Sequence, residues 1–368
     1  MFKINTLDFM AHMHHNPVLK SLSNTLTFQI WKSFKLTSIF MAISFAFFFS
    51  CREEKKEEPK GNFAVIGDEI VDALTIALDK DPLNDQLRYK RAERLYTLKK
   101  YDECIEDLRV AITTDSLQPP YYHLLADAFL DNNLSSRALQ AMQKAGALFP
   151  NRIPTLLKLS ETQLILAQYD AAILTLNEIV RLDAQNAEAY FMLGTTLNEM
   201  GEKQRAINAF QTATELDAKL IDAWVSLGNL YDELGDKTAL TIFKNAVNIA
   251  PQNPTAIHAL AFYLQNHGQE QEAISLYRKV TTLDPTYTAA YLNCGILLME
   301  KDSTDKAFEM FNIMVGTDPK DWAGYHYRGL IYLKKGKNAE ALADFRSSTN
   351  LNPENEEGLK MIKKLEKK

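Results

Sequence analysis

The chain has 368 residues but only three cysteines, at positions 51, 104 and 294, and this spacing does not favour a disulfide framework. It contains no H-E-x-x-H, G-x-S-x-G or paired C-x-x-C motif, so nothing predicts a zinc site, a hydrolase nucleophile or a redox centre. An excess of positive charge is also missing, because Lys and Arg number 41 against 47 Asp and Glu. This balance disfavours binding to nucleic acid or to an anionic membrane surface. We therefore expect neither an enzyme nor a cofactor.

The chain is instead repetitive. A small residue recurs every 34 positions, with a single step of 33, and in every repeat but the first an aromatic or aliphatic residue stands four places before it. These small residues are Ala92, Ala126, Ser160, Gly194, Gly228, Ala261, Gly295 and Gly329. A period of this length predicts a solenoid of stacked repeats.

Each repeat contains two amphipathic stretches with helical spacing, such as Tyr190, Leu193 and Leu197, followed by Ala206 and Phe210. Between the two stretches lie glycines that suit the left-handed end of a helix, namely Gly201, Gly235, Gly268 and Gly336. Prolines close several repeats, namely Pro150, Pro251, Pro285, Pro319 and Pro353. The pattern predicts a pair of helices per repeat that approach closely at the small residue.

The sequence resembles tetratricopeptide repeat (TPR) proteins over most of its length. The clearest copy, 187–218, carries Tyr190, Leu193, Gly194, Leu197, Gly201, Ala206, Phe210 and Ala213 at the positions of the family pattern. The resemblance implies an all-α, right-handed solenoid of about eight helix-turn-helix repeats. In this register the units are 85–118, 119–152, 153–186, 187–220, 221–253, 254–287, 288–321 and 322–355.

Two further helices are expected at the ends of the array. Residues 67–84 contain Ile70, Leu74 and Ala77 at the places of a second repeat helix, which suggests a lone N-terminal capping helix. Residues 356–368 alternate apolar residues with lysines and suggest a C-terminal capping helix. The fifth unit is one residue short, and its alignment places the deletion in the turn near 236–238.

Residues 1–50 resemble the leader of a bacterial lipoprotein. An apolar run from Leu36 to Phe49 ends at Ser50-Cys51, and it is too short for the ~30 Å hydrocarbon core of a membrane. The resemblance implies that Cys51 is lipidated and that the protein is an outer-membrane lipoprotein, facing the periplasm or the cell surface. Residues 51–66 then form a polar tether.

In TPR proteins the first helices line a concave groove, and the resemblance implies that this groove binds a protein or peptide. The implied groove residues are Leu157, Phe191, Asn198, Asn229, Asp232, His258, Phe262, Leu292, Ile296, Met299, Leu330 and Leu333. Its middle is polar and acidic, whereas its C-terminal third is apolar. His123, His258 and His326 share one column of the groove and are interpreted as lining residues rather than metal ligands. A carboxylate clamp is not expected, because the corresponding column has no lysine.

Two functions are compatible with these features. The first is a lipid-anchored scaffold or adaptor that binds protein partners at the cell envelope through its groove. The second is a structural subunit of an envelope machine for pilus, secretion or outer-membrane protein assembly. The sequence favours no particular partner or oligomeric state.

Overall fold

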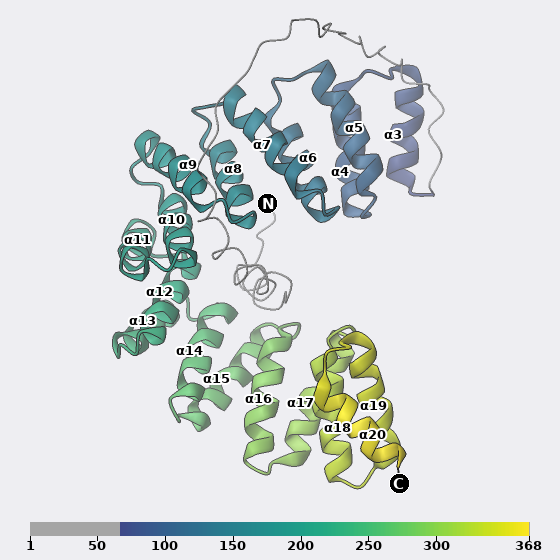
Figure 1. The fold of residues 1–368 in the computed structure, drawn as a ribbon, viewed down its shortest axis with the longest axis vertical. Helices are drawn as coiled ribbons and strands as arrows, with labels where there is room; N and C mark the ends of the chain where they lie inside the picture. The colour runs from purple at the N-terminus through teal and green to yellow at the C-terminus, as the bar shows by residue number, and fades with distance from the viewer. Residues whose placement is uncertain (1–66, 368) are drawn as a thin grey trace, which may run out of the picture. The chain divides into compact units, whose positions relative to one another are not determined.

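The computed structural model describes residues 67–367, and within them every regular element is an α-helix (Figure 1). The first helices of the eight repeats are α4 (Asp85–Thr97), α6 (Pro119–Asp131), α8 (Ile153–Ile165), α10 (Ala187–Glu199), α12 (Ile221–Glu233), α14 (Pro254–Asn266), α16 (Thr288–Glu300) and α18 (Trp322–Lys334). The second helices are α5 (Tyr101–Thr114), α7 (Ser135–Leu148), α9 (Tyr169–Leu182), α11 (Lys203–Leu216), α13 (Thr238–Ile249), α15 (Glu270–Leu283), α17 (Thr304–Thr317) and α19 (Asn338–Leu351). Helices α3 (Glu69–Lys80) and α20 (Glu356–Glu366) flank them. Each helix contacts the next one along the chain, so the predicted all-α solenoid is confirmed.

The small-residue column is the contact between the two helices of each repeat. A Cβ atom built on Gly228 would lie 2.6 Å from the ring of Phe243, and one on Gly194 or Gly295 would lie equally close to Phe210 or Phe311. Where the small residue is Ala92, Ala126 or Ser160, the facing position holds the smaller Leu108, Met142 or Leu176, each fully buried. Glycine therefore makes room for the phenylalanine ring in these repeats, whereas the sixth repeat packs the fully buried Tyr277 at the position facing Ala261.

The turn between paired helices needs one residue with a left-handed backbone. Gly201, Gly235, Gly268 and Gly336 supply it with φ between 70° and 78°, as their positions in the sequence predict. In the other four repeats the equivalent residues are not glycine: they are Lys99, Asn133, Ala167 and Asp302, with φ between 54° and 59°. The backbone geometry is thus kept even where the side chain makes it costly.

The deletion in the fifth repeat shortens a helix start. Helix α13 has 12 residues, whereas α11 in the preceding repeat has 14. Its first residue is Thr238, so the missing residue is taken from the turn and first helical positions after Gly235. The rest of the repeat keeps its contacts, because Ala239, Phe243 and Ala246 are all buried.

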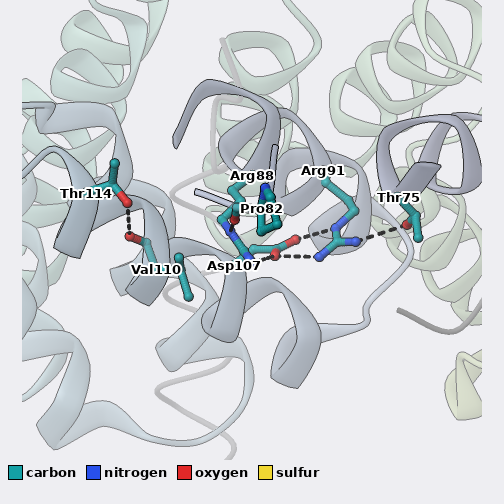
Figure 2. Close-up of polar contacts among 7 residues, drawn as sticks. All are labelled: Thr75, Pro82, Arg88, Arg91, Asp107, Val110 and Thr114. Carbon is teal, nitrogen blue, oxygen red and sulfur yellow. Dashed lines mark hydrogen bonds and ion pairs between the residues drawn. The ribbon is translucent and has the colours of Figure 1, made fainter. Parts of the chain in front are cut away.

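A polar network joins α3 to the first repeat (Figure 2). Asp107 on α5 accepts hydrogen bonds from Arg88 and Arg91 of α4 at 2.7–2.8 Å, and all three side chains are buried. Arg91 also donates to Thr75 of α3 at 3.0 Å, and Arg88 donates to the carbonyl of Pro82 at 2.7 Å. These bonds fix the position of α3 on the array.

The face by which α3 packs differs from the expected one. Val71, Thr75 and Leu78 are buried, whereas Ile70 is 53% exposed and Leu74 and Ala77 are only half-buried. The sequence pattern did identify the helix, but Ile70, Leu74 and Ala77 occupy the side where a first helix would lie, and residues 67–367 contain no helix before α3.

Candidate functional site

The first helices form a continuous face. Besides its own second helix, a first helix can also approach the next first helix, as seen for α4 with α6, α6 with α8, α8 with α10, α12 with α14, and α16 with α18. Corresponding positions on these helices are therefore brought side by side along the array. This arrangement makes the face of the first helices the candidate binding groove.

The apolar part of the groove lies on α14, α16 and α18. Phe262 of α14 is 45% exposed, which is unusual for a phenylalanine. Ile296 and Leu330 hold the same register position on the next two first helices and are half-buried. These three side chains form a stepped apolar strip along one side of the array.

The other predicted apolar residues contribute to the core as well as to the groove. Leu292, Ile296 and Met299 are half-buried and pack against the hydrophobic core of the C-terminal repeats, and Leu333 is also half-buried. Further toward the N-terminus, Leu157 packs against the buried cluster around Leu176 and Ile179. Phe191 contacts the ring of Phe210 with ring centroids 5.9 Å apart. Such residues present one edge to the groove while the remainder is covered.

The polar middle of the groove lies on α10 and α12. Asn229 is exposed and Asn198 half-buried, and neither side chain has a hydrogen-bond partner in the part of the chain that the structure describes. Asp232 lies 3.3 Å from Nε2 of His267, so it is partly engaged. Side-chain amides with free donors and acceptors can bind the backbone of an extended peptide.

The structure corrects the prediction for one of the three histidines, His326. His326 is 4% exposed and lies 3.1 Å from the side-chain amide of Asn355, so it is part of the core rather than of the groove. His258 has Nε2 3.2 Å from the amide nitrogen of Asn293 and contacts the rings of Tyr277 and Tyr287. His258 therefore connects α14 to α16, and His326 connects α18 to the N-terminal end of α20.

The environment of two histidines disfavours their protonated form. Burial lowers the pKa of His258 to about 4. Burial, helped by Arg152 and Lys158, also lowers the pKa of His123 to about 4, and its Nε2 lies 3.1 Å from the hydroxyl of Thr155. Both rings are therefore neutral at physiological pH.

Two features of the N-terminal groove were not predicted. Lys158 on α8 forms ion pairs with Asp127 of α6 at 2.6 Å and with Glu161 at 3.0 Å, which joins two adjacent first helices. A shallow pocket of about 300 Å³ is lined by residues of α4, α6 and the turn before α6, among them Tyr89 and Tyr121, whose ring centroids lie 4.9 Å apart. The 34-residue repeat could have indicated both contacts, because residues 31 to 32 positions apart lie on adjacent first helices.

The described residues form neither a metal site nor a reactive thiol. Among residues 67–367 no group of three or more His, Cys, Asp and Glu side chains could hold a metal ion. Cys104 and Cys294 are buried, and burial raises the pKa of the Cys104 thiol to about 12, far from the range of a reactive thiolate. None of the described helices is long and apolar enough to cross a membrane. Cys51 lies outside the described residues.

Comparison with known proteins identifies the repeats. Models of the tetratricopeptide repeat match residues 187–220, 221–253, 254–287 and 322–355. None of the curated proteins that were compared is similar to the chain in sequence.

Solved structures support the fold. The yeast Tom70 structure is 20% identical, with a TM-score of 0.58 over 84% of this chain and 66% of that one. The structure of the APC/C hetero-tetramer Cut9-Hcn1 is 16% identical, with a TM-score of 0.50 over 80% of this chain and 62% of that one. This chain thus spans less than two thirds of either protein, and at such identity the likeness concerns the fold alone. The matched segments are tetratricopeptide repeats, and the described part of the chain is an all-α solenoid built from helix pairs of the same kind.

Proposed function

We propose that this protein is a lipid-anchored scaffold of the bacterial cell envelope, and that it holds a segment of a partner protein in the groove of its first helices. The exposure of Phe262 carries the groove part of the proposal. A phenylalanine with 45% of its surface in water, followed by Ile296 and Leu330 at the same register position, is an apolar strip that a bound segment would cover.

The polar middle complements this strip. The free amides of Asn198 and Asn229 lie two repeats and one repeat before Phe262, respectively, where they can bind the backbone of the same segment. Asp232 on the same surface favours a segment that carries positive charge. The apolar anchors then supply most of the affinity, and the amides set the direction of the chain.

The groove is tested with one double variant. Phe262→Ser with Met299→Ser should abolish capture of the partners that the wild-type protein retrieves from envelope fractions, with helicity unchanged by circular dichroism. Leu174→Ser is the matched control, because Leu174 is 72% exposed on the second helix α9, away from the groove. If the double variant retrieves the same partners at the wild-type yield, the groove is not the binding site.

The anchoring part rests on the sequence before the repeats. The apolar run that ends at Ser50-Cys51, followed by a charged tether, supports acylation of Cys51 and location in the outer membrane. Mass spectrometry of the mature N-terminus should find lipid on Cys51 and no residue before it. An intact segment 1–50, or a Cys51→Ala protein that stays bound to membranes, contradicts the lipoprotein.

A further inference from the structure

The N-terminal end of the array exposes apolar side chains that the other repeats bury. In each of the eight second helices α5 to α19, the residue facing the small-residue column is almost completely buried, as Leu108, Phe243 and Phe345 illustrate. Helix α3 has the same register, yet Ile70 is 53% exposed, and Leu74 and Ala77 are half-buried. On its outermost side Ile76 is 58% exposed.

The end of a solenoid normally carries polar residues on its outer face, because no further repeat covers it. Helix α20 at the other end largely follows this rule with exposed Lys360, Lys363 and Lys364, although Leu359 is 40% exposed. Helix α3 does not.

The outward stripe of α3 is complementary to itself. Glu69, Ala73, Ile76 and Lys80 follow one another at helical spacing and are all exposed. When this stripe is paired with an antiparallel copy, Glu69 faces Lys80 and Ala73 faces Ile76, and each contact occurs twice. Opposite charges then meet at both ends, and a small side chain opposes a large one at the centre.

We propose that a second copy of this chain covers the stripe of Glu69, Ala73, Ile76 and Lys80, with the two α3 helices antiparallel across a two-fold axis that passes between Ala73 and Ile76. Such an interface is isologous, so one stripe supplies both halves. Antiparallel packing also places the positive N-terminal end of each helix dipole beside the negative C-terminal end of the other. Two 12-residue helices make a small contact, typical of a weak dimer that local concentration favours.

The test uses the full-length chain in the membranes of cells that express it. Ala73→Cys places a thiol close to the axis, and a short thiol-specific cross-linker should join two chains into a dimer. Asp79→Cys is the matched control, because Asp79 is also exposed but lies on the flank of α3, away from the stripe. The control should remain monomeric, and so should the wild type with its own cysteines.

A charge exchange tests the pairing itself. In the Ala73→Cys background, Glu69→Lys should cause loss of the cross-linked dimer, because two lysines then face each other at both ends. Adding Lys80→Glu should restore it, which a general loss of helix stability would not do. A monomeric Ala73→Cys protein overturns the proposal in two distinguishable ways. If maleimide labels the thiol, the face is uncovered; if it does not, another protein or the preceding residues of the same chain cover it.

Discussion

Arg91 donates two hydrogen bonds to the carboxylate of Asp107, both 2.7 Å long, between the two helices of the first repeat. Arg328 makes the same paired contact with Asp344 in the last repeat, at 2.8 Å. Each arginine also bonds to the preceding second helix, Arg91 to Thr75 and Arg328 to Asn312. The first and last repeats thus share a polar junction with the helix before them.

The inner repeats fill the same two positions without an ion pair. Their residues at the arginine position are Leu125, Leu159, Leu193, Leu227, Leu260 and Cys294, and those at the aspartate position are Ala141, Thr175, Ala209, Ile242, Leu276 and Met310. A buried ion pair adds little net stability over such apolar residues, but it favours one geometry over others. We infer that these pairs fix the register of the junctions next to the ends of the array.

Removing one residue of the Arg328–Asp344 ion pair should destabilise the folded protein far more than replacing both residues. Asp344→Ala leaves the Arg328 guanidinium without its carboxylate and should lower the free energy of unfolding by about 3 kcal/mol. The double variant Arg328→Leu with Asp344→Ala installs the residues of the fourth repeat and should regain most of that loss. Urea denaturation measures both, and a double variant no more stable than Asp344→Ala contradicts this account.

A surface pair provides the control for that experiment. Arg181 contacts Glu178 at 2.6 Å, but its side chain is 67% exposed on α9. Arg181→Ala should leave the urea midpoint unchanged, because water screens the pair.

The Gly228–Phe243 contact predicts an unusual pair of effects. Gly228→Ala puts a methyl group 2.6 Å from the ring of Phe243 and should destabilise the array by ~1–3 kcal/mol, with a larger loss for Gly228→Leu. Adding Phe243→Leu to Gly228→Ala recreates the Ala and Leu of the first repeat and should recover part of the loss. Gly316→Ala is the control, because a Cβ there meets nothing within 4 Å. A Gly228→Leu protein with unchanged thermal midpoint and helicity would refute the assigned register.

Replacing Ala167 by glycine should stabilise the folded protein. It holds the left-handed position of the third turn with φ 54°, which costs an L-residue roughly 1–2 kcal/mol, whereas glycine tolerates it. Ala167→Gly should therefore raise the free energy of unfolding by about 1 kcal/mol after the greater entropy of glycine in the unfolded chain is subtracted. The reverse change, Gly268→Ala at φ 73°, should lower it. Equal and opposite shifts in thermal midpoint are the expected outcome, and a destabilised Ala167→Gly protein would contradict it.

The 34-residue spacing predicted the helices, their turns and the shortened fifth repeat because these depend on local residues. Gly201 and Gly235 determine their own backbone conformation, and Gly228 packs against a residue of the same repeat, Phe243, only 15 positions later. Contacts between repeats were harder to predict. His326 lies in the same column as His258 and was expected in the groove, yet Asn355 and the capping helix bury it.

The groove itself could be placed but not divided into exposed and covered parts. Phe262 and Ile296 occupy one register position, but only Phe262 is strongly exposed. How far each side chain is covered depends on the packing between neighbouring first helices, which a repeat pattern does not specify. The open face of α3 was missed for the same reason, since the pattern of Ile70, Leu74 and Ala77 matches a buried face.

The stability of the array should fall in mild acid because of two histidines. The pKa values of His123 and His258 are both lowered to about 4, so these rings stay neutral in the folded state below pH 6.5, whereas the unfolded chain binds protons there. Above pH 6.5 both states are neutral and the histidines add no pH dependence. Between pH 6.5 and 4 each should cost at most about 1.4 kcal/mol per pH unit, and less where water reaches the ring.

Comparison with a variant isolates this effect from that of the carboxylates. His123→Gln with His258→Gln keeps hydrogen-bonding groups at both positions but removes the titrating rings. The difference in free energy of unfolding between wild type and variant, measured by urea denaturation, should be constant above pH 6.5. It should then move in favour of the variant as the pH falls toward 4. A difference that does not change with pH would mean that both rings bind protons in the folded state over the same pH range as in the unfolded chain. The burial of His123 and His258 would then not be maintained in solution.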